Sequence, residues 1–316
     1  MRQFTAVVNP SAGTGGGAAA LIPLARLLRE AGAGLEVEYS RGLAHAREIA
    51  HRTAAQGGVV LGVGGDGMIG CVGGALAGTG ATFGIVPAGR GNDFARQLGL
   101  PADPAGLAEV LLHAEPRPVD VIDAVTGAEP SGDSGAEPSG ERAAEGASPV
   151  RIRGTVVLGS VYAGVDAVAN RNANRSRLLR GRASYTFGAV RAVASWRPVE
   201  YRITVDGEPY DRPAYTVVAA NSGFYGSGRH VAPAARVDDG LLDIVIVRHA
   251  PRRLFFAVMR ELEDGTHVRR PEVEVLRGRE VRIEADRDLP WGADGEVDER
   301  LPVTARIVPG ALNVLM

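Results

Sequence analysis

Three glycine-rich segments contain the residues that could do chemistry. Residues 9–13 read Asn-Pro-Ser-Ala-Gly, residues 64–67 read Gly-Gly-Asp-Gly, and residues 89–93 read Gly-Arg-Gly-Asn-Asp. Glycine lets backbone N–H groups approach an anion closely and adopts positive φ without strain, and a helix that begins after such a loop adds a favourable dipole. One such loop is weak evidence, because any tight turn between a strand and a helix can use glycine. Three of them indicate a nucleotide or phosphate site.

Two of these segments also contain a carboxylate. Asp66 lies inside the second segment and Asp93 ends the third. A carboxylate beside bound phosphates is repulsive unless Mg²⁺ lies between them, and Mg²⁺ binds one or two carboxylates together with phosphate oxygens and waters. The pattern therefore favours a Mg²⁺ site that includes Asp66. For Asp93, the N-cap of a helix is an equally good interpretation.

The elements that must position these segments alternate between strand and helix. Apolar strands separated by helices of about 10–15 residues are typical of βαβ units and a parallel sheet, and loops at the carboxyl edge of such a sheet bind ligands. The predicted strands are Phe4–Val8, Leu35–Tyr39, Val59–Val63, Phe83–Ala88 and Val119–Val125, and the predicted helices are Ala18–Ala31, Leu43–Gln56, one that ends at Ala77 and one that begins at Phe94.

The second half of the chain is predicted to be mostly β. Many short strands separated by turn residues favour an antiparallel sandwich. The fold prediction is therefore an α/β, doubly wound parallel-sheet nucleotide domain followed by a β-sandwich domain. The predicted strands of the second half are Arg151–Ser160, Tyr201–Val205, Tyr215–Ala220, Leu242–Val247, Val273–Leu276 and Glu280–Glu284, with helices at Tyr185–Ser195 and Arg252–Glu263.

A polar segment separates the two halves. Residues 127–149 are rich in Gly, Ser, Pro and Glu, and the sequence of residues 126–132 partly recurs at residues 134–140. Such a segment buries too little apolar surface to offset the entropy of ordering, so we predict a disordered loop. The predicted domains are residues 1–126, which bind the nucleotide, and residues 150–299, which bind the substrate.

Composition narrows the class of protein. The net charge is −2, and all 35 basic residues counted as Lys or Arg are arginine, so no P-loop lysine is present. This charge argues against a nucleic-acid-binding surface over the whole molecule. Cys71 is the only cysteine, which fits a reducing compartment. A strand-like run starts at Phe4, and no apolar stretch reaches the ~20 residues of a membrane span. We therefore expect no signal peptide, a cytoplasmic location and only peripheral membrane contact.

The motifs together resemble the catalytic-domain motifs of diacylglycerol kinases, a pattern shared with sphingosine kinases and bacterial soluble lipid kinases. The resemblance spans nearly the whole chain except residues 127–149. It implies a nucleotide domain related to NAD kinases and phosphofructokinases, a β-sandwich domain on the lipid side, and a C-terminal segment, residues 300–316, that returns toward the first domain. The similar segments are Asn9–Gly13, Gly64–Gly67, Pro87–Arg96, Gly226–Leu242 and Asp294–Glu296.

The resemblance also implies roles for individual residues. Asp66 would belong to the catalytic Mg²⁺ network, with Asp93 and Asp120 in support, and Glu296 would be the general base. A second, structural Mg²⁺ would bind Asp239 and the backbone carbonyls of Arg236 and Leu241. The implied nucleotide contacts are Asn9, Pro10, Ser11, Ala12, Gly13, Ser40, Gly64, Gly65, Asp66, Gly67, Met68, Gly70, Cys71, Gly89, Arg90 and Asn92.

Several positions depart from the family pattern. Met68 replaces a usual Thr, Gly70 and Cys71 replace Asn-Glu, and Arg90 replaces another Thr. Two hydroxyls that could bond phosphate oxygens are therefore lost. Arg90 could replace one of them with a charge-assisted contact, which is stronger than a neutral hydrogen bond. In the alternative interpretation, Arg90 faces solvent and the affinity for nucleotide is lower.

The triplet Asp-Gly-Glu occurs twice, at residues 206–208 and 294–296. Asp-Gly between strands is a common hairpin turn, so both triplets have a purely structural interpretation. We predict an exposed hairpin at residues 206–208. The second triplet follows Trp291-Gly292-Ala293, which we interpret as an irregular stretch where a carboxylate could be partly desolvated and its pKa raised. The pattern alone does not choose between the triplets, and the family resemblance selects Glu296.

The expected function is an ATP-dependent, Mg²⁺-requiring lipid kinase that converts diacylglycerol to phosphatidic acid. A sphingoid base, ceramide or another lipid alcohol is an alternative acceptor, and a non-catalytic nucleotide- or lipid-binding homologue is a further alternative. The expected partner is a membrane lipid at the inner bilayer surface, with no nucleic acid and with a homodimer left open. Five arginines between residues 171 and 182 are either a solvated helix face or a patch for anionic headgroups.

Overall fold

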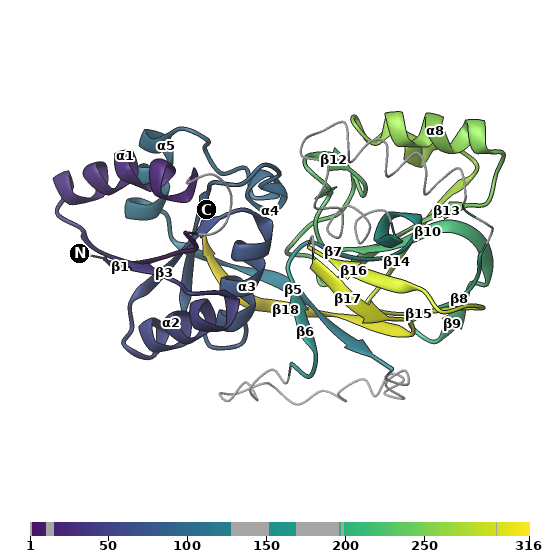
Figure 1. Ribbon diagram of the computed structural model, residues 1–316, viewed down its shortest axis with the longest axis horizontal. Coiled ribbons are helices and arrows are strands. Elements are labelled where there is room, and N and C mark those ends of the chain that lie inside the picture. Colours follow the sequence, from purple (N-terminus) through teal and green to yellow (C-terminus); the bar gives the residue numbers. More distant parts are fainter. Residues whose placement is uncertain (1, 11–15, 128–151, 169–195, 197–198, 295) are drawn as a thin grey trace, which may run out of the picture.

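The computed structural model describes residues 2–10, 16–127, 152–168, 196, 199–294 and 296–316. It has two lobes that are joined by a single path of hydrogen-bonded strands (Figure 1), in the order β17-β16-β7-β10-β8-β15-β18-β4-β3-β1-β2. The predicted combination of a parallel α/β domain and a β-sandwich-like domain is confirmed. No helix among these residues is long and apolar enough to cross a bilayer.

The N-terminal lobe is a parallel sheet with helices on both faces. Strands β4, β3, β1 and β2 pair in parallel. Alternate strand residues face opposite sides, so Phe4 packs with α1 and α5, whereas Val7 packs with α2 and α3. The elements are β1 (Gln3–Val8), α1 (Gly16–Glu30), β2 (Gly34–Tyr39), α2 (Leu43–Ala55), β3 (Val59–Gly64), α3 (Asp66–Leu76), β4 (Thr82–Pro87), α4 (Asp93–Gln97), α5 (Pro104–His113) and β5 (Pro116–Thr126).

The fifth predicted strand does not belong to the parallel sheet. β5 pairs antiparallel with β18 (Val303–Leu315) and with β6 (Thr155–Val157). The place beside β4 is taken by β18, whose Asn313 and Val314 pair in parallel with β4. The expectation of five parallel strands was wrong because the competing strand lies almost two hundred residues further along the chain, beyond the reach of local pattern.

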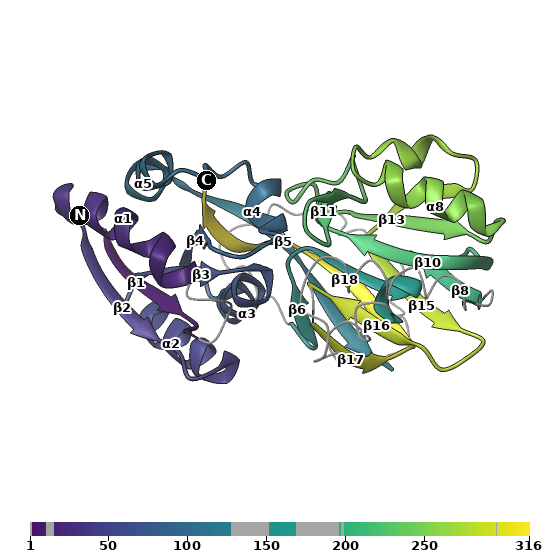
Figure 2. The same ribbon diagram turned by 45° about the horizontal axis from the view of Figure 1, so that its top comes forward.

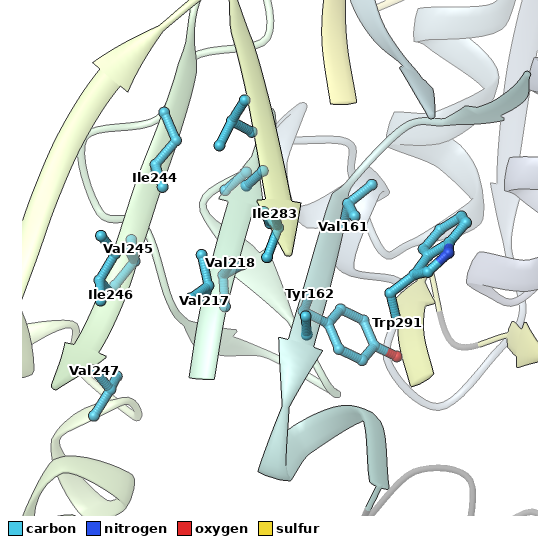
Figure 3. Packing of buried hydrophobic residues seen from close by; sticks show 14 of the residues in the cluster. Val161, Tyr162, Val217, Val218, Ile244, Val245, Ile246, Val247, Ile283 and Trp291 are labelled. Carbon is cyan, nitrogen blue, oxygen red and sulfur yellow. The ribbon is translucent and has the colours of Figure 1, made fainter. Parts of the chain in front are cut away.

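The C-terminal lobe is built from antiparallel strands with a shared apolar core (Figure 3). β10 and β13 are buried along almost their whole length, which explains their continuous rather than alternating apolar sequence. The elements are β6, β7 (Ser160–Gly164), β8 (Val199–Val205), β9 (Glu208–Pro209), β10 (Arg212–Ala220), β11 (Phe224–Tyr225), β12 (Arg229–His230), β13 (Leu242–Arg248), α8 (Arg252–Glu261), η1 (Thr266–Arg269), β14 (Val273–Gly278), β15 (Glu280–Ala285), β16 (Pro290–Ala293), β17 (Glu296–Arg300) and β18.

Within the predicted strand Arg151–Ser160, the described residues form only β6, and a second strand, β7, begins at Ser160 and continues to Gly164. β6 pairs with β5, and β7 pairs with β10 and β16. Between them, the backbone N–H groups of Leu158 and Gly159 donate to the carboxylate of Asp294 instead of to a neighbouring strand. The break therefore results from a long-range contact that the local sequence does not reveal.

β18 connects the two lobes. Its first residues pair with β15 in the C-terminal lobe, and its last residues pair with β4 in the N-terminal lobe. Figures 1 and 2 show this strand running from one lobe into the other, with the C-terminus beside the parallel sheet. Among the predicted segments, Ser11–Gly13, the loop at 128–149, the arginine cluster at 171–182 and the helix Tyr185–Ser195 lie outside the described residues.

Candidate active site

Two of the glycine-rich segments meet at the carboxyl edge of the parallel sheet. The N–H of Ala88 donates to the carbonyl of Gly64 at 2.8 Å. A Cβ on Gly89 would lie 2.3 Å from the Cα of Gly65, so the two loops touch at a distance that only glycine permits. The segments at residues 64–67 and 89–93 therefore form one surface, as the sequence predicted.

The loop at residues 89–92 is closed by Asn92. Its Oδ1 accepts from the N–H of Gly89 at 2.8 Å, and its Nδ2 donates to the carbonyl of Gly89 at 3.1 Å. Asn92 has φ 51, a left-handed conformation that asparagine tolerates well. The neighbouring Arg90 is exposed, which leaves its guanidinium accessible to solvent or to an anion in front of the loop.

Asp66 connects the two loops through its side chain. It is the first residue of α3, and its Oδ1 accepts from the N–H of Asp93 at 2.6 Å and of Phe94 at 3.4 Å. Asp66 therefore caps the N-terminus of α4, a contact that its own sequence motif does not reveal. Its second oxygen, Oδ2, points toward Gly91, where an added Cβ would lie 2.7 Å away.

Asp93 holds a different segment in place. Its Oδ2 accepts from the N–H of Ser227 at 2.9 Å and its Oδ1 from the N–H of Gly228 at 2.6 Å. Burial raises the pKa of Asp93 and the charge of Asp66 raises it further, whereas these two N–H groups oppose the shift. Asp93 thus fixes the β11–β12 hairpin of the C-terminal lobe against the carboxyl edge of the parallel sheet in the N-terminal lobe. The helix cap for α4 is provided by Asp66 and not by Asp93.

The donor set fits a Mg²⁺ ion that is completed by phosphate oxygens. Both oxygens of Asp93 accept backbone N–H groups, and the same is true of Asp120, which binds Gly240 and Gly310 at 2.7 and 2.8 Å. Asp66 keeps Oδ2 without a hydrogen-bond partner among the described residues. One carboxylate oxygen with phosphates and waters is a common Mg²⁺ arrangement. Groups of three or more acidic, His or Cys side chains placed for a metal are absent from the described part of the chain.

A cavity of about 370 Å³ lies next to these loops, between the lobes. Figure 2 shows α3 of the N-terminal lobe near β6 of the C-terminal lobe, where this cavity is located. Its volume is in the range of small-molecule sites. The lining residues are Leu43, Arg47, Gly67, Gly70, Cys71, Thr155, Val156, Val157, Trp291, Ala293, Asp294 and Glu299.

Asp294 provides a half-buried carboxylate to this cavity. Its oxygens accept from the N–H groups of Leu158, Gly159 and Ser160 at 2.8, 3.0 and 3.2 Å. Burial nevertheless raises the pKa of Asp294 to about 6, and the charge of Asp66 adds to the rise while the three N–H groups oppose it. Gly159 makes room for this side chain, because a Cβ there would lie 2.5 Å from Oδ1 of Asp294, whereas a Cβ on Gly70 would be in ordinary contact, 3.5 Å from Oδ2.

Both Asp-Gly-Glu triplets are two-residue hairpin turns. Val205 pairs with Glu208 across the first turn, and Ala293 pairs with Glu296 across the second. The interpretation of residues 291–293 as irregular was wrong, because they form β16 between β7 and β17. The hairpin at 206–208 is exposed, as predicted.

In the second triplet, the desolvated carboxyl belongs to Asp294. The structure describes the backbone of Glu296 but not its side chain, so its role as a base stays a prediction.

The remaining predicted nucleotide contacts have different surroundings. Ser40 lies at the end of β2, and its buried hydroxyl has no hydrogen-bond partner among the described residues. Asn9 and Pro10 follow β1. The side chain of Met68 is buried in the core and its N–H donates to Gly65, so it offers nothing to a phosphate. Gly67, Gly70 and Cys71 line the cavity.

The predicted second Mg²⁺ site has protein partners instead. Asp239 accepts from the N–H of Leu241 at 3.1 Å and forms an ion pair with Arg277. The side chain of Arg236 pairs with Asp238 at 3.1 Å. The carboxylate of Asp239 is therefore paired with Arg277 in this structure, and the second Mg²⁺ site, which also involves the backbone carbonyls of Arg236 and Leu241, stays a prediction.

Sequence reasoning missed several residues of the site. Asp294 was passed over for Glu296, although both belong to the same triplet, and the hairpin signal of Asp-Gly was the available clue. The sequence does not indicate that the backbone N–H groups of Ser227 and Gly228 belong to the site, because serine and glycine predict only a turn there. Arg47 and Trp291 reach the cavity only through the packing of α2 and β16.

Comparison with known proteins agrees with this geometry. The family model "Diacylglycerol kinase catalytic domain" matches residues 3–124, and "YegS C-terminal NAD kinase beta sandwich-like domain" matches residues 159–316. A protein of Mycobacterium tuberculosis (strain H37Rv) named diacylglycerol kinase is 31% identical over 319 residues, which cover 99% of this chain and 94% of that protein. The chain belongs to the diacylglycerol kinase catalytic-domain family.

A second relative and a solved structure with the same fold extend the comparison. A protein of Chromohalobacter salexigens named "Probable lipid kinase YegS-like" is 31% identical over 298 residues, covering 90% of this chain and 85% of that protein. The crystal structure of a diacylglycerol kinase from Bacillus anthracis (strain Sterne) superposes with a TM-score of 0.67 at 19% identity, covering 99% and 96% of the two chains. The family predicted from the motifs is confirmed, and the enzyme class is a lipid kinase.

Proposed function

We propose that this diacylglycerol kinase family member transfers the γ-phosphoryl group of ATP to the hydroxyl of diacylglycerol, with Mg²⁺, at the inner face of the membrane. The observation that carries the proposal is the Oδ2 oxygen of Asp66. It lies where two phosphate-type loops touch and has no hydrogen-bond partner in the described part of the chain. A carboxylate in that position repels phosphate unless a cation lies between them.

The nucleotide would lie along the glycine-rich loops, with its phosphates facing Asp66. Support comes from the buried hydroxyl of Ser40, which has no hydrogen-bond partner among the described residues and lies beside the end of β1, and from the exposed guanidinium of Arg90 in the loop at residues 89–93. Bound Mg²⁺ would be held by Asp66 together with phosphate oxygens, and it would neutralise charge on the transferring group. The cavity lined by Gly67 and Gly70 is the space for the rest of the nucleotide.

The chemical step needs a base and an aligned hydroxyl. The lipid oxygen attacks the γ-phosphorus, the bond from that phosphorus to the β–γ bridging oxygen breaks, and ADP leaves. The proton of the lipid hydroxyl passes to a carboxylate, for which we propose Glu296. Asp294, two residues earlier, anchors the hairpin that carries Glu296 through its three backbone N–H contacts.

Diacylglycerol as the acceptor rests on the relatives. Proteins named diacylglycerol kinase include the Mycobacterium tuberculosis relative, which this chain matches over nearly its whole length. Other relatives carry only the broader name of lipid kinase. The acceptor must therefore be identified by experiment.

The test is transfer of label from γ-³²P-ATP to a panel of lipid alcohols in detergent micelles. Diacylglycerol is expected to be labelled in preference to ceramide and sphingosine, with no product when Mg²⁺ is removed. Asp66→Asn should lower kcat by more than about 10²-fold, because its metal-facing oxygen is lost, while circular dichroism stays unchanged. A variant within tenfold of wild type would remove Asp66 from the metal network, and no product with any lipid would refute the kinase assignment.

A further inference from the structure

Helix α8 lies on the outer side of the C-terminal lobe (Figure 1). It has one buried and one exposed face. Phe255, Val258 and Leu262 are 2–3% exposed and pack on the core of that lobe. Phe256, in contrast, is 45% exposed. The inner face alone thus accounts for the packing of the helix, and Phe256 requires another explanation.

Phe256 lies between two exposed arginines on the same face. Arg253 precedes it by three residues and Arg260 follows it by four, which is the spacing of neighbours on a helix surface. Neither arginine takes part in an ion pair with another residue that the structure describes. We name the stripe of Arg253, Phe256 and Arg260 the α8 stripe.

The charge around this stripe is strongly one-sided. Residues 248–260 contain four arginines and no acidic residue, although the whole chain has a net charge of −2. Glu261, at the end of the helix, is neutralised by Arg270, with contacts of 2.6 and 2.7 Å. Glu263 and Asp264, which form no ion pair with an arginine that the structure describes, follow only beyond the helix. An aromatic ring between unpaired arginines complements an anionic lipid surface, where arginines meet headgroups and the ring enters the interface.

α8 is also connected to the candidate active site. The carbonyl of Leu262, directly after the helix, accepts from the N–H of His230 in β12 at 2.6 Å. The turn between β11 and β12 contains Ser227 and Gly228, whose N–H groups bind Asp93. Two sets of hydrogen bonds therefore link α8 to Asp93: one joins Leu262 to β12, and the other joins the β11–β12 turn to the Asp93 carboxylate.

We propose that the α8 stripe is the surface by which this protein docks on an anionic bilayer. The proposal rests on the proposed function in one respect only, namely that the acceptor is a membrane lipid. Docking through α8 places the C-terminal lobe against the bilayer. It also fixes the position of the β11–β12 hairpin and of the cavity between the lobes relative to the headgroup layer. The predicted arginine cluster at 171–182 is not needed for this inference.

Binding to vesicles tests the proposal without catalysis. Wild-type protein should co-sediment with mixed phosphatidylcholine–phosphatidylglycerol vesicles, bind pure phosphatidylcholine weakly and lose affinity as salt rises. The variant Arg253→Gln/Phe256→Ala/Arg260→Gln should lose affinity for the anionic vesicles by at least about thirtyfold, since each arginine near such a surface contributes about fivefold. All three side chains are exposed, so circular dichroism and Tm should stay close to those of wild type.

A matched control is available on α1 of the other lobe. Ile22, Arg26 and Arg29 are exposed at helical spacing, and Ile22→Ala/Arg26→Gln/Arg29→Gln changes the net charge by the same amount. This variant should bind vesicles like wild type. Equal loss in both variants, full binding by the α8 variant, or no binding of wild type to anionic vesicles would each overturn the proposal.

A catalytic readout separates this inference from the proposed function. The α8 variant should phosphorylate diacylglycerol in anionic vesicles at least tenfold more slowly than wild type. With a short-chain diacylglycerol dispersed as monomers, its rate should equal that of wild type. Equal slowing on both substrates would contradict a docking role. A wild type that binds vesicles through α8 but phosphorylates no lipid would refute the proposed function and leave the docking surface standing.

Discussion

At the scale of single residues, the site is held together by carboxylates that bind backbone N–H groups. Asp66, Asp93 and Asp294 each accept at least two N–H groups from a segment distant in sequence. Asp120 does the same at the edge of the lobes. N–H groups carry only partial positive charges, so the cluster stays electrically negative. That is the environment in which a divalent cation and its phosphates are best accommodated.

The raised pKa of Asp294 predicts a pH-dependent difference in stability between wild type and Asp294→Asn. The pKa is about 6 in the folded protein against an ordinary value of 3.8. The folded state therefore holds the proton more tightly than the unfolded state. The stability that this group provides is fully present below pH 4 and is lost as the pH rises to 6. Asparagine does not ionise, so the Tm of the variant relative to wild type should rise across this window and then level off.

Thermal unfolding of the metal-free and nucleotide-free proteins between pH 4 and pH 8 measures this difference. The expected change across the window is on the order of a few degrees. The buried Asp93, Asp120 and Asp243 also titrate, but they are present in both proteins and cancel in the comparison. A Tm difference that is constant across this range would show that Asp294 has an ordinary pKa and is not desolvated in solution.

At the scale of elements, the two Asp-Gly-Glu hairpins have the same length and different surroundings. The first joins β8 to β9 in solvent, and the second joins β16 to β17 beside the cavity. If Glu296 is the base, Glu296→Gln should lower kcat by at least about 10² with little change in the KM for ATP. Glu208→Gln is the matched control and should be silent in the same lipid phosphorylation assay. If Glu208→Gln lowered kcat and Glu296→Gln were silent, the base would lie on the first hairpin and the assignment to Glu296 would be wrong.

The sequence predicted most elements of the N-terminal lobe because they depend on local pattern, although α5 was not predicted and β5 was assigned to the wrong sheet position. The turn after Val8, the loop at Gly64–Gly67 and the loop at Gly89–Asp93 each follow a short apolar run, and the alternation with helices is regular. Local pattern could not show that β18 occupies the place beside β4, or that Asp294 divides residues 155–164 into two strands. Both outcomes depend on contacts between residues more than a hundred positions apart.

The same limit explains what was missed in the candidate site. The phosphate loops carry their signal in glycine and aspartate at fixed spacing, so Asp66 was found from the sequence. The capping of α4 by Asp66 and the capture of Ser227 and Gly228 by Asp93 are backbone contacts, and backbone donors are the same for every residue type. Met68 was predicted near the nucleotide because of its place in the motif, but its side chain helps to fill the core.

At the scale of the whole molecule, the two lobes share the C-terminal strand. β18 bends at a register shift between Val308 and Leu312, where Gly310 has φ 60 and donates its N–H to Asp120. Asp120 also accepts from Gly240, so one carboxylate fixes β18 to the loop that precedes β13. The last residues of the chain thereby become part of the N-terminal lobe, and the orientation of the lobes about the cleft depends on them.

This arrangement predicts that Leu315, in the last part of β18, controls the stability of the N-terminal lobe. Leu315 is fully buried among residues of β1, β3, α1 and α5. Leu315→Ala should lower the free energy of unfolding by about 2–5 kcal/mol, the usual cost of a buried Leu-to-Ala change. ATP affinity should fall with it, because β3 and β4 carry the loops at Gly64 and Gly89. Urea unfolding and nucleotide titration measure the two effects.

Asn313→Ala, at a half-buried position of the same strand end, is the control and should lower the free energy of unfolding by about 1 kcal/mol or less. A Leu315→Ala protein as stable as this control would show that β18 does not hold the N-terminal lobe together.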